Sequence, residues 1–267
     1  MQALRRSPDS PRSWGNAPVR LWCSISLLVL ALAAGLIAVN HKMSSATFPD
    51  AERLPRLVMP RPGEKVVFFG DSWTQGYSAS PETSGYAYRV GQRLGVVAEV
   101  KSGRGSGYVN LGADNAGTYK DRLLPLPVDP DVRLLILQGS VNDLRYWKQA
   151  RPAAVEAMTL AREKFPSAQI VVLAPAPAKA EDIDAVRTLS EQITSAASSL
   201  GLYVINPAAR GWIDGSNIDT IIDPVTRHPS TQGHAFLADK LLEALQELAR
   251  DGQPRRHFDG YPGAATS

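Results

Sequence analysis

The chain of 267 residues has few side chains that form cross-links or bind metals, because it contains one cysteine and four histidines. A single cysteine excludes an intramolecular disulfide, so a folded domain must rely on its hydrophobic core. The histidines are too few for a metal centre, and no cluster of His, Cys, Asp or Glu has convincing ligand spacing. We therefore expect no metal and no other cofactor. The hydrophobic content of 44% is sufficient for a globular core.

The chain also lacks an excess of positive charge outside its N-terminal segment, although its formal net charge is +3. Residues 1–42 carry five basic residues and one acidic residue, so this segment supplies +4 and the rest of the chain is near −1. A nucleic-acid-binding protein needs basic residues clustered on its folded domain. We therefore expect no nucleic-acid partner. The five basic residues are Arg5, Arg6, Arg12, Arg20 and Lys42.

One long apolar run, residues 21–39, contains no charged side chain. As a helix it would extend about 28 Å, close to the hydrocarbon thickness of about 30 Å. The arginines before it favour a cytoplasmic N-terminal side, which leaves the rest of the chain outside. We expect residues 1–20 to form a cytoplasmic basic tail and residues 21–39 a membrane anchor that contains Cys23. A cleaved signal peptide followed by secretion is the alternative.

Beyond this run, residues 40–63 are polar and proline-containing, which predicts a linker to a single domain at 64–250. Residues 251–267 are polar and predict a flexible tail. Within the domain, β-rich runs alternate with helical patterns. The expected strands are 65–70, 96–101, 132–138, 169–174 and 202–206. The expected helices are 84–94, 151–165, 181–200 and 232–250.

This alternation predicts an α/β fold with three layers, α/β/α, around a central, mostly parallel five-stranded sheet of the flavodoxin-like type. Residues 106–130 contain several glycines and prolines and little periodicity, so we expect a long surface loop there.

The first expected strand ends in Gly70-Asp71-Ser72. The carboxyl ends of parallel strands border the crevice where open α/β sheets bind ligands, so Ser72 is a candidate nucleophile. A serine hydroxyl is weakly nucleophilic by itself, and this assignment requires a base and donors for an oxyanion.

Two histidines lie within the expected domain near its last helix. His228 precedes a proline, which disfavours helix and places it on a loop where its imidazole can reach the sheet edge. His234 falls inside the helical pattern, where a packing or helix-start role is more typical. We therefore expect His228 to be the base.

Oxyanion donors are expected after the second and third strands. The glycines of segment 102–108 allow close approach of backbone N–H groups to a ligand, although a tight turn needs them too. Asn142 follows the third strand and can aim its amide at a developing oxyanion, although Asn142-Asp143 can also cap a helix.

Together these segments resemble the SGNH (GDSL-like) hydrolase family, in its membrane-anchored bacterial type. The segment Gly70–Gly76 is similar to the family's Gly-Asp-Ser-x-Thr-x-Gly block, and the resemblance extends over residues 64–248. It implies that Ser72 is the nucleophile and that His228 is the base. It also implies that the N–H groups of Ser72 and Gly105 and the amide of Asn142 form the oxyanion hole, with Gly103 as an alternative register for Gly105.

Two positions depart from the family pattern. Ser140 stands where the family usually has glycine in its third block. The family's acid lies three residues before the histidine, and Val225 occupies that place. Asp223 lies five residues before His228 and is the expected third catalytic residue if the loop bulges. The alternative is a backbone carbonyl behind the imidazole, which would leave a dyad.

The resulting prediction is a serine ester hydrolase of the esterase, lipase or acetylesterase type, acting through an acyl-enzyme on small-molecule, glycan or lipid esters. One alternative is an acyltransferase to sugar hydroxyls, and another is a non-catalytic carbohydrate-binding domain on the cell surface. We expect Tyr108, Tyr146 and Trp147 to bind substrate. The sequence leaves the oligomeric state open.

Overall fold

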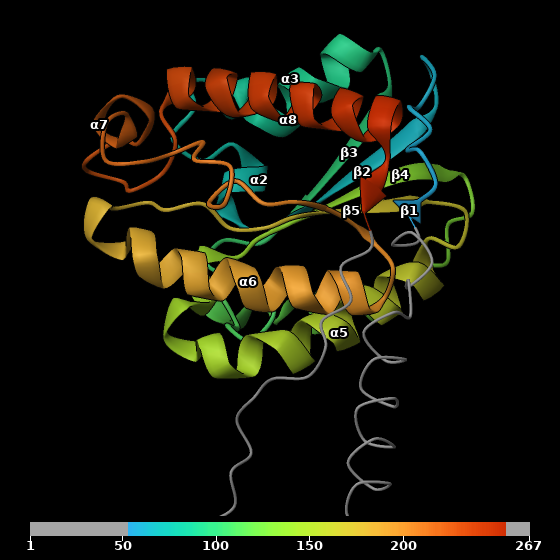
Figure 1. Ribbon diagram of the computed structural model, residues 1–267, viewed down its shortest axis with the longest axis horizontal. Helices are drawn as coiled ribbons and strands as arrows, with labels where there is room; N and C mark the ends of the chain where they lie inside the picture. The colour runs from blue at the N-terminus through green and yellow to red at the C-terminus, as the bar shows by residue number, and fades with distance from the viewer. Residues whose placement is uncertain (1–52, 255–267) are drawn as a thin grey trace, which may run out of the picture. The chain divides into compact units, whose positions relative to one another are not determined.

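The computed structural model describes residues 53–254, which form an α/β domain around a five-stranded sheet (Figure 1). All neighbouring strands of this sheet are parallel, in the order β3-β2-β4-β5-β6. The predicted five-stranded parallel sheet is thus confirmed, and its order is that of flavodoxin-like folds. The strands are β2 (Lys65–Gly70), β3 (Val97–Ser102), β4 (Val132–Gln138), β5 (Gln169–Leu173) and β6 (Tyr203–Ile205).

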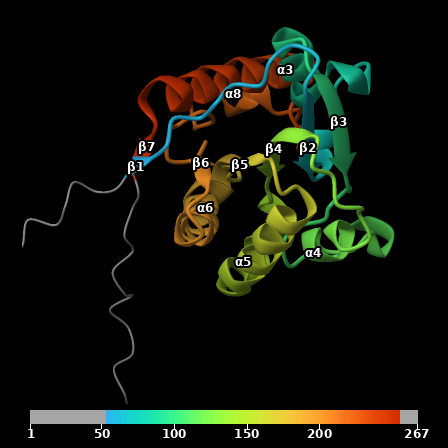
Figure 2. The ribbon, with the colours of Figure 1, turned by 90° about the vertical axis from the view of Figure 1, so that its right-hand side faces the viewer.

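Helices cover both faces of the sheet. α3 (Tyr86–Leu94) and α8 (Thr231–Asp251) lie on one face, and α5 (Trp147–Lys164) and α6 (Ile183–Ser199) lie on the other (Figure 1). Figure 2 shows α4 (Tyr119–Leu123) beside α5. The shorter helical segments are α2 (Ser72–Gln75), α7 (Ile218–Ile221), η1 (Glu82–Ser84), η2 (Ala113–Asn115), η3 (Val141–Tyr146) and η4 (Ala180–Asp182).

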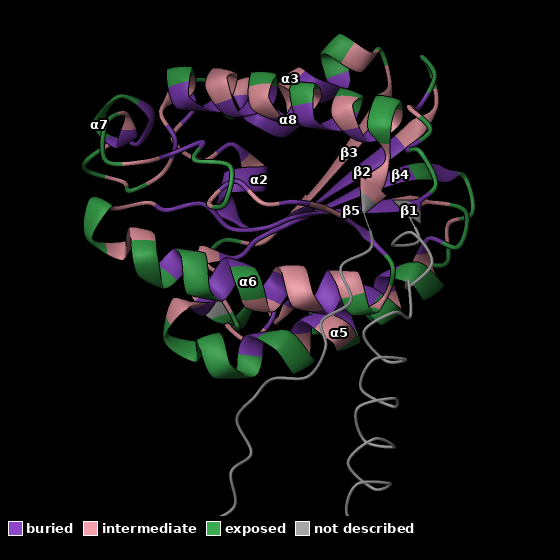
Figure 3. Ribbon diagram, in the orientation of Figure 1, coloured by how far each residue is buried: buried purple, intermediate pink, exposed green. Residues whose placement is uncertain are grey.

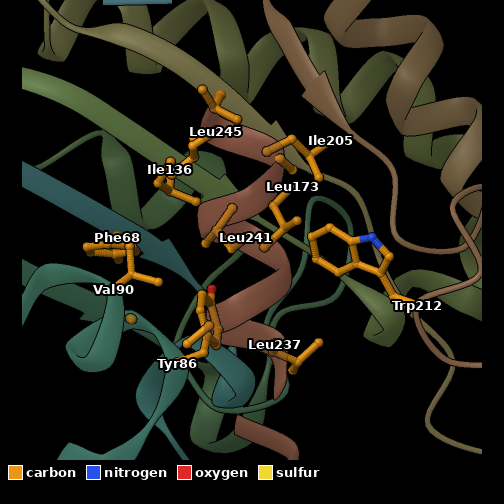
Figure 4. Packing of buried hydrophobic residues seen from close by; sticks show 14 of the residues in the cluster. Phe68, Tyr86, Val90, Ile136, Leu173, Ile205, Trp212, Leu237, Leu241 and Leu245 are labelled. Atoms are coloured by element: carbon orange, nitrogen blue, oxygen red, sulfur yellow. The ribbon is translucent and has the colours of Figure 1, made fainter. Parts of the chain in front are cut away.

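The apolar run of β2 is continuous because its residues pack alternately on both faces. Val66 and Phe68 join the core under α3 and α8, whereas Val67 and Phe69 join the core against α5 and α6. Figure 4 shows the first core, in which Phe68 lies near Val90 of α3. The sheet is therefore buried throughout its centre, as the purple strands in Figure 3 show.

The expected surface loop at 106–130 is more ordered and more buried than predicted. Thr118 and Asp121 form a capping box that starts α4, and Tyr119 and Leu123 are fully buried. A helix of five residues is too short to show a hydrophobic period, so the pattern of this segment gave no helical signal. α5 also begins at Trp147, four residues before the predicted start, with Pro152 inside it.

The packed domain begins before residue 64. β1 (Arg53–Leu54) pairs antiparallel with β7 (Gln253–Pro254), and Leu54 and Leu57 are buried (Figure 2). Part of the expected linker therefore contributes to the core. The expected anchor at 21–39 lies outside the described residues. Among the described helices, none combines the length and apolar character needed to span a bilayer.

Candidate active site

Ser72 is positioned by the turn from β2 into α2. The Asp71 carboxylate accepts a hydrogen bond of 2.9 Å from the Trp73 amide and so caps α2, whose first residue is Ser72. The Ser72 residue is 5% exposed. It lies at the carboxyl end of β2, beside β4, where the strand order reverses. This reversal is the usual ligand crevice of an open α/β sheet.

Gly70 is required by the close packing of this turn. A Cβ atom at this position would overlap Thr74 Oγ1 and Gln138 Oε1. These two atoms are hydrogen-bonded at 2.7 Å, and Gln138 Oε1 also accepts from the Asp71 amide at 3.3 Å. The end of β4 thus holds the turn that presents the nucleophile.

The structure brings His228 into contact with Ser72. Ser72 Oγ and His228 Nε2 are 2.8 Å apart, and His228 Nδ1 is 2.6 Å from the backbone carbonyl oxygen of Thr226. A carbonyl oxygen can only accept, so Nδ1 carries the proton and donates to it. Nε2 is then free of a proton and accepts from the Ser72 hydroxyl. This Ser72–His228 pair is consistent with a catalytic dyad.

The environment of His228 favours its neutral form. Burial lowers the pKa of the imidazole, and Arg104 lowers it further, whereas the Thr226 carbonyl and the charge of Asp223 raise it. The Tyr77 ring packs against the imidazole edge-on at 4.6 Å between centroids, with the Arg104 guanidinium 4.6 Å from the centre of the Tyr77 ring. His228 is therefore held in place and uncharged, as a general base must be.

The neutral imidazole leads to a prediction about pH dependence. Because a base must be unprotonated to act, and the pKa of His228 is lowered, the acid limb of kcat/KM is expected below about pH 6.5, the ordinary histidine value. The charge of Asp223 raises that pKa, so Asp223→Asn should move the limb to lower pH. Asp219 is exposed on α7, and Asp219→Asn serves as the matched control. A limb that moves upward in Asp223→Asn would contradict this account.

His234 has a structural role in this site. Its Nδ1 accepts from the Tyr86 amide and its Nε2 donates to the Tyr77 carbonyl, both at 3.2 Å. Both nitrogens are used by the neutral ring, and burial lowers its pKa to about 4. His234 therefore supports Tyr77, which in turn contacts His228.

The Asp223 carboxylate faces its own loop. Its Oδ1 accepts from the amides of Val225 at 2.9 Å and Thr226 at 2.8 Å, and these bonds lower the pKa of Asp223. The two additional residues of the loop bulge outward, and Val225 is 87% exposed. The position behind His228 Nδ1 is occupied by the Thr226 carbonyl. The sequence allowed either Asp223 or a backbone carbonyl behind the imidazole. The structure has the backbone carbonyl of Thr226 there.

Two backbone N–H groups are available for an oxyanion. Ser72 stands at the first position of α2, where its N–H has no partner within the helix. Within residues 53–254, neither this N–H nor that of Gly105 donates a hydrogen bond. Gly105 has φ +68°, a conformation that favours glycine. The free Ser72 and Gly105 amides, together with the dyad, provide the parts that acyl transfer requires.

Asn142 stands on the adjacent strand end. Its Nδ2 donates to the Ser106 carbonyl at 3.0 Å and to Asp71 Oδ2 at a longer 3.3 Å. Ser140, which replaces the family's glycine, places its hydroxyl 3.0 Å from Asp71 Oδ2 and 2.9 Å from the Ser106 carbonyl. The Ser140 hydroxyl, which a glycine would lack, thus adds a contact between the turn that carries Ser72 and the loop after β3 that contains Ser106.

Asn142→Ala is expected to lower kcat by about 10²-fold while KM changes little, because an oxyanion donor acts in the transition state. The developing oxyanion would replace Asp71, the more distant of the two acceptors of Nδ2. Steady-state kinetics on an aryl acetate measure the effect, and thermal unfolding verifies that the variant is folded. A kcat within about two-fold of wild type would exclude Asn142 as a donor.

Two buried carboxylates have roles that the sequence did not reveal. Burial raises the pKa of Asp71 to about 6. Asp143 accepts hydrogen bonds of 2.7–3.0 Å from the amides of Tyr108, Val109 and Asn110, and so orders the loop after β3. Both residues belong to motifs examined for the serine and the asparagine. Asp71 directly precedes Ser72 and Asp143 directly follows Asn142, so their position beside the candidate site residues was the available sequence signal for these two carboxylates.

Arg122 connects the turn after β2 to β3 and to the loop that follows β3. Its Nη1 donates to the Gly70 carbonyl at 2.9 Å and to Ser106 Oγ at 2.8 Å, and its Nη2 donates to the Lys101 carbonyl at 2.9 Å. The guanidinium lies 4.4 Å from the centre of the Phe69 ring. Burial of this group lowers its pKa.

The residues expected to bind substrate fall in different environments. Tyr108 is 2% exposed and packs against Tyr119 at 4.8 Å between centroids, so it lies in the core and not on an accessible surface. Tyr146 and Trp147 are each 37% exposed, at the junction of η3 and α5. Among the described residues, no group of His, Cys, Asp and Glu side chains is arranged to hold a metal ion.

Known proteins resemble this chain in sequence and in fold. A GDSL lipase of Mycobacterium tuberculosis is 27% identical over 190 residues, which cover 67% of this chain and 80% of that protein. A crystal structure of a lipolytic G-D-S-L family member from Veillonella parvula has a TM-score of 0.54 at 21% identity and covers 69% and 99% of the two chains. A family two carbohydrate esterase from Clostridium thermocellum has a TM-score of 0.53 at 16% identity and covers 70% and 65%.

The solved structures share the fold, and the family assignment comes from the sequence. The sequence profile of the GDSL-like Lipase/Acylhydrolase family matches residues 68–236, which contain Ser72, Gly105, Asn142 and His228. The chain belongs to this family and is an ester hydrolase.

Proposed function

We propose that this enzyme hydrolyses O-acyl esters of carbohydrates through an acyl-enzyme on Ser72. The observation that carries the catalytic part is the 2.8 Å contact between Ser72 Oγ and His228 Nε2. The Ser72 and Gly105 amides donate no hydrogen bond within residues 53–254, which leaves them available to an oxyanion. This arrangement offers a nucleophile, a base and oxyanion donors within one site.

In the first half of the reaction, His228 Nε2 takes the Ser72 proton as Oγ attacks the acyl carbonyl carbon. The carbonyl oxygen becomes an oxyanion and accepts hydrogen bonds from the Ser72 and Gly105 amides and from Asn142. When the tetrahedral intermediate collapses, the bond to the alcohol oxygen breaks, and His228 gives its proton to the leaving alcohol. The acyl group stays on Ser72 as an ester.

In the second half, a water molecule attacks the acyl-enzyme and gives a proton to His228. Collapse of the second intermediate breaks the bond to Ser72 Oγ, which recovers its proton from His228, and the carboxylic acid leaves. The Nδ1–H bond to the Thr226 carbonyl keeps the imidazole in one orientation and one tautomer through both halves.

The carbohydrate part of the proposal is supported by Tyr146 and Trp147. Both rings are partly exposed a few residues after Asn142, and the Lys148 ammonium lies 5.5 Å from the Trp147 ring. Partly exposed aromatic rings offer apolar faces with polar edges, which suits binding of a sugar ring. The carbohydrate esterase from Clostridium thermocellum provides a precedent for such a substrate on this fold.

A comparison of substrates tests this proposal. The protein without its apolar run, residues 43–267, is assayed with p-nitrophenyl esters of increasing chain length and with acetylated oligosaccharides. We expect acetate release from the oligosaccharides, and Trp147→Ala should lower kcat/KM on them more than on p-nitrophenyl acetate. Equal losses on both substrates, or hydrolysis confined to long-chain lipid esters, would contradict it. Acyl transfer to added oligosaccharide in place of water would instead favour the transferase alternative.

A further inference from the structure

We propose that Ser78, Thr226 and Asp223 form a clamp that positions His228, in place of the acid that the family carries three residues before its histidine. The clamp consists of two hydroxyls and one carboxylate behind the Thr226 carbonyl. This inference rests on the proposed dyad of Ser72 and His228, and it assigns positioning roles to Ser78 and Thr226.

The hydrogen bonds of the clamp run in one direction. Asp223 Oδ1 lies 3.2 Å from Thr226 Oγ1, and Thr226 Oγ1 lies 2.6 Å from Ser78 Oγ. A carboxylate accepts, so the single hydroxyl proton of Thr226 goes to Asp223. Ser78 must then donate to Thr226. This chain of bonds joins the histidine loop to the segment that follows the nucleophile helix α2.

The backbone of the loop closes around the same residues. The Asp223 amide donates to the His228 carbonyl at 2.8 Å, and the Arg227 amide donates to the Asp223 carbonyl at 2.9 Å. The peptide between Thr226 and Arg227 is therefore held on both sides: its N–H bonds to Asp223, and its C=O accepts from His228 Nδ1. A peptide carbonyl becomes a better acceptor when the N–H of the same peptide group is also hydrogen-bonded, because neighbouring hydrogen bonds polarise one another.

Backbone conformation on both sides of the clamp supports this role. Ser78 has φ +73° and Arg227 has φ +60°, in the left-handed region that residues with a side chain rarely adopt. Such conformations persist where the surrounding contacts determine them. Here the contacts are the Ser78–Thr226 hydroxyl bond and the Arg227–Asp223 backbone bond.

The functions of a single acid are thereby divided between two groups. The Thr226 carbonyl makes the direct contact and sets the tautomer of His228. Asp223 supplies the negative charge without touching the imidazole. Its carboxylate accepts hydrogen bonds from the amides of Val225 and Thr226, and these bonds fix the position of the Thr226 carbonyl. Asp223 lies two residues earlier than the family's position for the acid, and this offset lets its carboxylate accept from the amides of Val225 and Thr226.

The test removes each hydroxyl without removing the carbonyl. Thr226→Val keeps the shape of the side chain and loses the hydroxyl, Thr226→Ser restores it, and Ser78→Ala removes the donor. Thr220→Val and Ser167→Ala are matched controls at exposed positions whose hydroxyls have no hydrogen bond in the described structure. The measurements are kcat and KM on p-nitrophenyl acetate, and the downfield Nδ1–H resonance of His228 in protein with nitrogen-labelled histidine.

We expect Thr226→Val and Ser78→Ala to lower kcat by about 10-fold with little change in KM, because a small displacement of a base reduces catalysis strongly. The Nδ1–H resonance should shift or broaden in both variants. Thr226→Ser and both controls should retain the wild-type kcat and resonance. A wild-type kcat and an unchanged resonance in Thr226→Val and Ser78→Ala would overturn the clamp, as would a loss that Thr226→Ser does not restore.

The two readouts also separate this inference from the proposed function. If the wild-type enzyme fails to release acetate from carbohydrate esters, the substrate assignment fails while the resonance still reports the clamp. If Thr226→Val does not fold, Ser78→Ala and Thr226→Ser still decide the result, because each leaves the Asp223 bonds to the backbone of the loop in place.

Discussion

Replacement of Ser72 by alanine is expected to lower kcat for ester hydrolysis by at least about 10⁴-fold, because it removes the atom that forms the acyl-enzyme. The surrounding structure changes little, since the Ser72 side chain makes one hydrogen bond, to His228. The free amides of Ser72 and Gly105 remain, so substrate can still bind. Hydrolysis of p-nitrophenyl acetate measures the loss.

Ser167→Ala is the matched control, because this serine is exposed on the turn before β5. It should hydrolyse the ester at the wild-type rate. Thermal unfolding of both variants verifies that neither change disturbs the fold. Retention of more than about 1% of the wild-type kcat in Ser72→Ala would show that another group is the nucleophile.

Replacement of His228 by alanine is the second large effect, with a loss in kcat of about 10⁴-fold or more. The Ser72 hydroxyl then has no acceptor within reach, and the leaving alcohol has no proton donor. His234 cannot substitute, because both of its nitrogens are hydrogen-bonded, to Tyr86 and to Tyr77, and its side chain is fully buried. Steady-state kinetics and the rate of fluorophosphonate labelling at Ser72 measure the loss.

Chemical rescue makes this second prediction specific. The alanine variant leaves a space beside Ser72 that free imidazole can enter, so added imidazole should restore part of the rate of His228→Ala. It should have no effect on Ser72→Ala, which lacks the nucleophile. A variant that keeps near wild-type activity without imidazole would show that His228 is not the base.

The three central strands were predictable because β2, β4 and β5 are short, mostly apolar runs buried on both faces. The run at 65–70 matches β2 residue for residue, and 132–138 matches β4. The short helix α4 was not predictable. Its five residues depend on a capping box and on the burial of Tyr119, and neither gives a periodic pattern.

Much of the candidate site could also be derived from the sequence, because its groups follow the ends of strands. The end of β2 indicated Ser72, and the proline after His228 placed that histidine on a loop. The orientation of Asp223 could not be derived, because a carboxylate near a histidine can face either the ring or the amides of its own turn. The Ser78–Thr226 contact joins residues far apart in the chain, and no local pattern announces it.

The location of the domain remains a prediction. Residues 21–39 are long and apolar enough to span a bilayer as one helix, with arginines on the N-terminal side. We propose on this basis that the catalytic domain is anchored to the cell membrane and lies outside the cytoplasm. Esters of envelope or extracellular glycans would then be within its reach.

The central claim, an acyl-enzyme on Ser72 formed with His228 as base, is tested most directly by trapping the intermediate. The wild-type enzyme is mixed with p-nitrophenyl acetate, quenched in acid within milliseconds, digested, and analysed by mass spectrometry. The account predicts an acetyl group on Ser72 in the wild-type enzyme and none on this serine in His228→Ala over the same time. Turnover without any acetyl group on Ser72, or with the acetyl group on a different side chain, would contradict it.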